Sequence, residues 1–270
     1  MKKFNIIISI LLVAISLSAC SGKSVETAAT TEGKVPATEK TTVTTTVERT
    51  TEDLNTTFPE NPTAKIYEGL SKDSSGNYPY ELASYTTYYN KNDETRTANL
   101  KSAVSKINDI KIPDSKVFSF NQTVGKRTIT AGYETAKVIA DGEFVDGLGG
   151  GVCQVSSTIF ECVLRANVEI VKRTYHSLEI SYVPLGGDAT VQWNSKDFQF
   201  KNTLGCDTKL VMTCKDGKLT CKLMAKEKVD TGNVKIKITK DKDTYTLVRT
   251  VNGKQNYSTK STYKKAGQQN

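Results

Sequence analysis

A cysteine that directly follows a run of glycines is the feature of this 270-residue chain most suited to carry chemistry. Gly149, Gly150 and Gly151 precede Val152 and Cys153. Glycine loses more backbone entropy on folding than other residues, so a glycine run is kept where the chain turns sharply or where another molecule comes close. Backbone N–H groups of such a run could hold an oxyanion, and the thiol beside them could act as a nucleophile.

A cysteine nucleophile needs a base, and His176 is the one histidine of the chain. The two residues together indicate a Cys/His pair. Two other interpretations also fit. In one, His176 has a structural role and Cys153 is a small apolar side chain packed beneath a helix. In the other, Cys153 is a redox-sensing thiol. A phosphate-binding loop is disfavoured, because the Gly-x-x-x-x-Gly-Lys-[Ser/Thr] pattern is absent.

The apolar residues after the glycines predict the helix that would carry Cys153. They recur at the helical spacing of a buried face, at Val155, Ile159, Cys162 or Val163, and Ala166. The predicted helix begins at or beside Cys153, and the partial positive charge of a helix N-terminus favours a thiolate. A strand over 168–173 would run back along this helix and bring His176 toward its start.

The other elements are predicted mainly as strands. A helix is expected over 95–109, and strands over 80–90, 178–183 and 188–193. Asp216-Gly217 and Asn252-Gly253 predict hairpin turns. The fold class that follows is α+β, with a mixed, mostly antiparallel sheet, a helix that starts at the Gly-Gly-Gly-Val-Cys motif, and a small C-terminal β appendage.

The N-terminus predicts export. Two lysines precede an apolar run over 4–17, which is the layout of a secretory signal and too short to span a bilayer comfortably. Leu-Ser-Ala-Cys at 17–20 resembles a bacterial lipobox, so Cys20 is the predicted lipidation site after removal of residues 1–19. Residues 20–62 are rich in Thr with few large apolar side chains, and predict a disordered tether. We expect a lipoprotein on the extracytoplasmic face of the membrane, at the cell wall.

After the tether we expect one domain over 63–227 and a small β-hairpin appendage over 228–270. The net charge is +8, from 37 basic and 29 acidic residues, and loss of Lys2 and Lys3 with the signal leaves +6. Such an excess on an exported chain suits an anionic membrane surface or wall. No RNA- or DNA-binding module accompanies it, so nucleic acid is not an expected partner.

Five cysteines remain besides Cys20. Because disulfides take cysteines in pairs, an odd number leaves at least one free thiol in an exported chain, and Cys153 is the favoured candidate. Cys206, Cys214 and Cys221 form no Cys-x-x-Cys pair, so no metal site and no cofactor are predicted. In the register set by the Asp216-Gly217 turn, Cys214 faces Leu219 and Cys221 faces Met212. That spacing is marginal for a disulfide, so ordinary strand cysteines are predicted.

Several stretches in order resemble the VanW domain of Gram-positive envelope proteins, over about 82–225. They are Thr-Ala-Asn (97–99), Val-Phe-Ser-Phe-Asn (117–121), Gly-Tyr (132–133), Gly-Gly-Gly-Val-Cys-Gln (149–154), Arg-Thr-Tyr-His-Ser (173–177) and Tyr-Val-Pro-Leu-Gly-Gly-Asp-Ala-Thr-Val (182–191). Some members of this family look like L,D-transpeptidases unrelated in sequence to the better-known enzymes of that name, whose Ser/Thr-His-Gly-Cys motif this chain lacks.

The resemblance implies roles for the matching residues. Cys153 would be the nucleophile, His176 the base and Asp188 the partner that orients it, although Asp188 equally suits a cap of the turn over 184–187. The implied oxyanion-binding and substrate-binding residues are Gly149, Gly150, Gly151, Gln154, Arg173, Ser177 and Tyr182. Gln154 is equally interpreted as the first helical residue, and Arg173 as a solvated strand charge.

The implied reaction is acyl transfer on peptidoglycan stem peptides through a thioester at Cys153, which gives 3-3 crosslinks. With water as the acceptor, the same site would be an L,D-carboxypeptidase, and both acceptors fit the sequence. A different class of function also fits: a non-catalytic envelope module that binds peptidoglycan or a glycopeptide in the same cleft.

Overall fold

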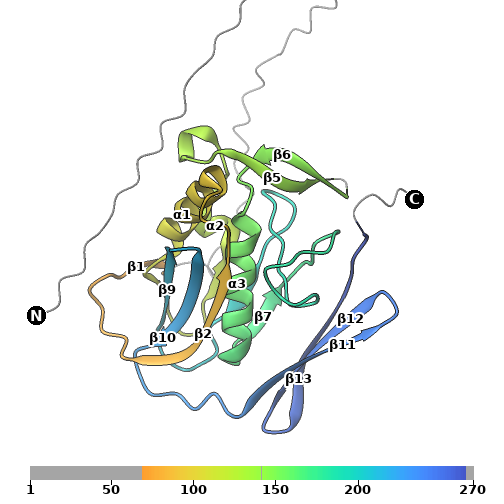
Figure 1. The fold of residues 1–270 in the computed structure, drawn as a ribbon. Helices are drawn as coiled ribbons and strands as arrows, with labels where there is room; N and C mark the ends of the chain where they lie inside the picture. Colours follow the sequence, from red (N-terminus) through yellow and green to blue (C-terminus); the bar gives the residue numbers. More distant parts are fainter. Residues whose placement is uncertain (1–68, 141, 266–270) are drawn as a thin grey trace, which may run out of the picture. The chain divides into compact units, whose positions relative to one another are not determined.

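The computed structural model describes residues 69–140 and 142–265. The predicted signal peptide, Cys20 and the tether lie outside the described residues. The described part is α+β, with antiparallel strand ladders and few helices, which confirms the predicted fold class (Figure 1).

The elements follow one another along the chain in a simple order. They are β1 (Ser71–Lys72), β2 (Tyr80–Tyr88), α1 (Glu94–Ile107), β3 (Ile110–Ile112), β4 (Val117–Ser119), α2 (Phe120–Val124), the 3-10 turn η2 (Ile129–Ala131), β5 (Thr135–Ala140), β6 (Glu143–Leu148), α3 (Val152–Arg165), β7 (Glu169–Lys172), β8 (Gln199–Lys201), β9 (Thr208–Lys215), β10 (Lys218–Ala225), β11 (Val234–Asp241), β12 (Thr244–Val251) and β13 (Lys254–Thr262).

The strands of the described part form a five-stranded sheet in the order β1-β3-β9-β10-β2 and three smaller sheets, β4-β8-β7, β5-β6 and β11-β12-β13. Asp216 and Gly217 have positive φ angles of 53° and 76°, which is the conformation a two-residue hairpin turn requires. Cys214 pairs with Leu219 and Cys221 with Met212, as predicted, and the five described cysteines are free thiols. Cys206 lies in the bend before β9 and not on a strand.

The central element is α3, which packs against β2, β10 and α1 (Figure 1). Its side chains are buried on all sides except at Cys153 and Arg165. A helix that is buried all round lies in the core of a domain. Cys153 is therefore the one position near the start of this helix that reaches the surface.

The prediction of strands over 178–183 and 188–193 is wrong. Both ranges belong to one irregular segment, which pairs only through isolated bridges, Leu178 with Lys264 and Gln192 with Lys196. Leu178, Val183, Ala189 and Val191 are buried, as apolar residues of a strand would be, but buried side chains bond the backbone at Ala189 in place of a neighbouring strand. Ser156 of α3, for example, donates to the Ala189 carbonyl oxygen at 2.6 Å.

The predicted small C-terminal β unit is the sheet β11-β12-β13. It is tied into the core, because Leu247 of β12 is fully buried in the main apolar cluster. Arg249 of the same strand donates to the carbonyl oxygens of Leu164 and Val168 at the end of α3, at 3.3 and 2.9 Å. These bonds tie β12 to the last turn of α3 and to Val168, just before β7.

Candidate active site

Cys153 lies in the first turn of α3, after a tight turn made by the three glycines. Gly149 and Gly151 have φ angles of 79° and 105°, in the left-handed region that favours glycine. Gly150 lies against β5, where an added Cβ would come within 2.6 Å of the Lys137 carbonyl oxygen. The turn itself therefore requires the glycines, and they fix where the helix begins.

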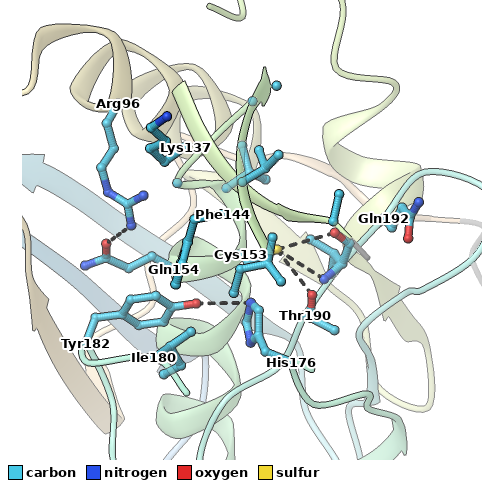
Figure 2. Close-up of a pocket in the computed structure, with 18 of the residues that line it drawn as sticks. Arg96, Lys137, Phe144, Cys153, Gln154, His176, Ile180, Tyr182, Thr190 and Gln192 are labelled. Carbon is cyan, nitrogen blue, oxygen red and sulfur yellow. Dashed lines mark hydrogen bonds between the residues drawn. The ribbon is translucent and has the colours of Figure 1, made fainter. Parts of the chain in front are cut away.

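The thiol of Cys153 contacts the irregular segment opposite the helix. Its sulfur lies 3.5 Å from Thr190 Oγ1 and 3.4 Å from the Val191 carbonyl oxygen, and the Val191 N–H donates to it at 3.5 Å (Figure 2). The side chain is half-buried and lines a cavity. In the first turn of α3, the Val152 N–H donates to the Gly149 carbonyl oxygen at 3.1 Å and the Gln154 N–H donates to the Gly151 carbonyl oxygen at 2.8 Å. What this helix end offers the thiol is therefore mainly its partial positive charge.

His176 is held by Asp188 on the side of its ring away from the cavity. Its Nδ1 lies 2.6 Å from Asp188 Oδ2, and its backbone N–H donates to the same oxygen at 2.7 Å. Both side chains are buried, His176 with 5% and Asp188 with none of its surface exposed. A carboxylate at Nδ1 leaves Nε2 for other partners, and Nε2 lies 3.3 Å from the Tyr182 hydroxyl, next to Cys153 (Figure 2).

The electrostatics of the three residues favour a thiolate beside an imidazolium. Burial opposes ionisation of Cys153, but the hydrogen bond and positive charge of His176 outweigh it and lower the pKa of the thiol from 9.0 to about 7. Burial likewise opposes the charged form of His176, but Asp188 and Cys153 raise its pKa to about 9. The pKa of Asp188 is lowered against its burial, chiefly by the His176 hydrogen bond and the charge of Arg173. Between pH 7 and 9 the ion pair is therefore the favoured form.

Two serines of α3 fix the segment that carries Asp188 and Thr190. Ser157 Oγ accepts from the Ala189 N–H at 2.9 Å and donates to the Cys153 carbonyl oxygen at 2.8 Å. Ser156 Oγ donates to the Ala189 carbonyl oxygen at 2.6 Å. The peptide groups on either side of Ala189 are thus bonded to the turn of helix that begins at Cys153, which sets the thiol against His176.

The thiol opens into a cavity of about 890 Å³. Its lining includes Val138, Phe144 and Leu148 of the β5-β6 hairpin, and Tyr182 and Trp193 of the irregular segment. Basic side chains dominate the charged lining, namely Arg96, Lys126, Arg127, Lys137 and Lys196 against Glu179. This lining suits an elongated ligand with carboxylate groups.

Residues 95–224 match the family model described as "VanW like protein". These residues belong to the VanW-like family. The chain is similar to "Uncharacterized protein YoaR" of Bacillus subtilis (strain 168), with 44% identity over 122 residues, or 45% of this chain and 40% of that protein. It is also similar to "Vancomycin B-type resistance protein VanW" of Enterococcus faecalis (strain ATCC 700802 / V583), with 27% identity over 137 residues, or 49% of this chain and 50% of that protein.

The chain thus spans half or less of the length of these curated relatives. No solved structure matches it significantly. The match to the VanW-like family contains Cys153, His176 and Asp188, and ends before β11.

Within the VanW-like domain, the structure brings Cys153, His176, Asp188 and Tyr182 together, with Gly149 and Gly151 on the cavity lining. Gly150 faces β5 and Ser177 does not line the cavity. The backbone carbonyl of Ser177 accepts from the Lys264 N–H at 2.8 Å, so its place is structural.

Two predictions for Arg173 are wrong: that it contacts a substrate carboxylate, and that it is a solvated charge on a strand. Its side chain is 2% exposed, and its guanidinium donates to Asp188 Oδ1 at 2.9 Å and to the Asp188 carbonyl oxygen at 2.6 Å. The Nε and both Nη atoms of this buried guanidinium already donate within the protein, so no pair of N–H groups is left to bind a ligand carboxylate. Arg173 is instead the counter-ion of Asp188.

The oxyanion contact predicted for the Gln154 side chain is also wrong. Its amide donates to Thr87 Oγ1 and the Tyr88 carbonyl oxygen, and its Oε1 accepts from Arg96 at 2.9 Å. The helix begins at Val152, so Gln154 is not its first residue either. Its role is to join α3 to β2 and to hold Arg96 at the cavity edge.

The site also has five contacting residues that were not predicted from the sequence: Thr190, Val191, Ser156, Ser157 and Tyr263. The hydroxyl run Ser-Ser-Thr at 156–158, inside an otherwise apolar helix, was a usable signal, because buried hydroxyls need partners. Among residues 69–140 and 142–265, no cluster of His, Cys, Asp and Glu has the size to hold a metal ion, and no helix is long and apolar enough to cross a membrane.

Proposed function

We propose that this protein is a cysteine-dependent L,D-transpeptidase that forms 3-3 crosslinks between peptidoglycan stem peptides. The observation that carries the proposal is the Cys153-His176-Asp188 arrangement. In it, His176 lowers the pKa of the Cys153 thiol to about 7, and the thiol lines a basic cavity. A low-pKa thiol at a helix N-terminus beside a histidine is the arrangement that nucleophilic acyl transfer needs.

In the first step, the Cys153 thiolate attacks the carbonyl carbon of the L,D peptide bond before the terminal D-Ala. In this proposal the resulting oxyanion lies at the N-terminus of α3, where the Cys153 N–H and the partial positive charge of the helix end stabilise it. When the C–N bond breaks, the His176 imidazolium gives its Nε2 proton to the leaving amine. D-Ala departs, a thioester remains on Cys153, and His176 is neutral.

In the second step, an amine of a neighbouring stem attacks the thioester carbonyl. Neutral His176 accepts the proton of that amine, and the C–S bond breaks to restore the thiolate and imidazolium. The product is an amide between two stems. With water as the acceptor the same steps release a tripeptide, which is L,D-carboxypeptidase activity.

The cavity supports a peptidoglycan substrate through its charge and form. Stem peptides carry several carboxylates, and Arg96, Lys126 and Lys196 bring positive charge to the lining of the cavity that the thiol also lines. Anchoring through lipidated Cys20, with residues 20–62 as a spacer on the extracytoplasmic face, would bring this domain to the wall; both belong to the proposal, and nucleic acid has no part in it.

The test is intact-protein mass spectrometry of residues 63–270 with a disaccharide tetrapeptide, beside Cys153→Ala. We expect an adduct equal to the stem minus D-Ala, absent from the variant, and a crosslinked dimer in solution. D-Ala release without a crosslinked product would indicate the carboxypeptidase. Binding of the tetrapeptide with neither adduct nor D-Ala release would overturn the proposal in favour of a binding module.

A further inference from the structure

The C-terminal sheet reaches the candidate active site, although it lies outside the residues that match the VanW-like family. Where β13 ends, the chain continues beside the segment that carries His176. Leu178 and Lys264 form a parallel bridge, and the Lys264 N–H donates to the Ser177 carbonyl oxygen at 2.8 Å. This contact sets the position of the preceding residue, Tyr263.

Tyr263 contacts the catalytic carboxylate directly. Its hydroxyl donates to Asp188 Oδ1 at 2.5 Å and accepts from the Gly186 N–H at 2.6 Å. The ring is 7% exposed and packs edge-on against Tyr175 and Tyr245, at centroid distances of 5.9 and 5.5 Å. A buried tyrosine whose hydroxyl both donates and accepts is held in a single orientation.

The two oxygens of Asp188 have different partners, and only Oδ1 is contacted from beyond the residues that match the family. Oδ2 accepts from the His176 ring and backbone. Oδ1 accepts from Tyr263 and from Arg173. Arg173 in turn donates to Ser261 Oγ of β13 at 2.8 Å, so the sheet supports the carboxylate both directly and through its counter-ion.

This division of partners has a physical consequence for His176. A fully buried carboxylate needs hydrogen bonds on both oxygens, and a side-chain torsion that satisfies Oδ1 also determines where Oδ2 points. Without a donor on Oδ1 from Tyr263, the carboxylate rests on Arg173 alone on that side. Its orientation toward His176 Nδ1 is then less strictly set.

We infer that Tyr263 is a positioning residue of the active site, which acts through Asp188 on His176, and that β13 is therefore part of the catalytic apparatus. The inference rests on the proposed function for its catalytic meaning. Its test, however, is the reactivity of the Cys153 thiol, which needs no substrate.

The experiment measures the rate at which iodoacetamide alkylates Cys153 at pH 7, followed by peptide mass spectrometry so that the other cysteines are counted separately. In Tyr263→Phe we expect alkylation roughly three- to tenfold slower, because a less well-held imidazolium stabilises the thiolate less. Tyr245→Phe is the matched control. It removes a hydroxyl from an adjacent ring of the same sheet that does not contact Asp188, and should leave the rate unchanged.

Ser261→Ala provides a second approach, because it removes the hydroxyl that accepts from Arg173 and that also lies within hydrogen-bond reach of Tyr263. We expect it to slow alkylation by a smaller factor, about twofold. Thermal unfolding of each variant checks the fold. Folded Tyr263→Phe and Ser261→Ala proteins that alkylate at the original rate would overturn the inference.

Turnover of the disaccharide tetrapeptide separates this inference from the proposed function. A lower kcat with unchanged KM in Tyr263→Phe would support both. Slower alkylation of Tyr263→Phe, in a protein whose original form never releases D-Ala, would uphold the positioning of His176 and remove the transpeptidase. Unchanged alkylation with normal turnover of Tyr263→Phe would do the reverse.

Discussion

The two sides of the cavity differ in how their side chains are held. On the inner wall, formed by the start of α3, His176 and residues 186–191, Ser157, Asp188 and His176 are buried and bonded through their side chains. The opposite side is the β5-β6 hairpin, which is held by its own ladder and exposes Phe144 and Leu148.

This difference separates reaction from recognition. The atoms proposed to react lie where buried hydrogen bonds fix the geometry, as acyl transfer would require. The apolar, exposed hairpin lies where a ligand would gain contact area without disturbing that geometry. Substitutions on the inner wall should therefore change kcat and thiol reactivity, whereas substitutions on the hairpin should change KM.

The largest effect is expected from His176→Ala, which removes both the proton carrier and the positive partner of the thiolate. Turnover should fall by at least about 10³-fold. Because the pKa of Cys153 would return from about 7 toward 9.0, alkylation at pH 7 should fall roughly fiftyfold.

The pH dependence of the original protein checks the same pair. Alkylation should rise as the pH passes about 7 and stay high, because it needs only the thiolate. Turnover should rise similarly but fall again above about pH 9, where His176 loses the proton that it gives to the leaving amine. Identical alkylation profiles for His176→Ala and the original protein would contradict the ion pair.

Asp188→Asn comes next, with turnover expected to fall on the order of 10²-fold, because the imidazolium loses its charged partner. The variant should also lose about 3 kcal/mol of stability in urea unfolding, since Arg173 is left as an unpaired buried charge. Asp197→Asn is the control. Asp197 is also buried and accepts from Ser119 and Asn121, and its loss should lower stability without slowing alkylation of Cys153. Equal alkylation in both variants would refute the role given to Asp188.

The sequence predicts much of the inner wall. Helical spacing placed the start of α3 beside Cys153, and the Asp216-Gly217 turn predicted the β9-β10 register. These signals are local, because a helix face and a two-residue turn are set by nearby residues. The return of the chain after α3 was likewise sufficient to bring His176 back to the helix start.

The errors concern long-range contacts. Arg173 was expected at a ligand or in solvent, but it is buried against Asp188 and Ser261, a contact made across separate sheets. The segments over 178–183 and 188–193 alternate like strands, yet the first pairs only through one bridge, and Ser156 and Ser157 bond the second at Ala189 from a helix. Periodicity reports which side chains are buried but not which groups satisfy the backbone.

A smaller effect on the inner wall is expected from Ser157→Ala, which leaves the Ala189 N–H buried without its acceptor. We expect a stability loss of about 1–3 kcal/mol in urea unfolding and a kcat roughly tenfold lower. Ser105→Ala, on the exposed face of α1, should change stability by no more than about 0.5 kcal/mol. A Ser157→Ala protein with unchanged kcat would mean that the inner wall tolerates looser geometry than its hydrogen bonds suggest.

The smallest effect is expected from Phe144→Ala on the hairpin. The ring is 51% exposed and lines the cavity, so its loss should leave the unfolding temperature and Cys153 alkylation unchanged. It removes apolar area available to the stem peptide, and KM should rise about threefold with kcat unaltered. Ile129→Ala is the matched control, because that side chain is 75% exposed but does not line the cavity. A fall in kcat for Phe144→Ala would show that the hairpin also orders the reacting groups, and the division between the two sides would no longer hold.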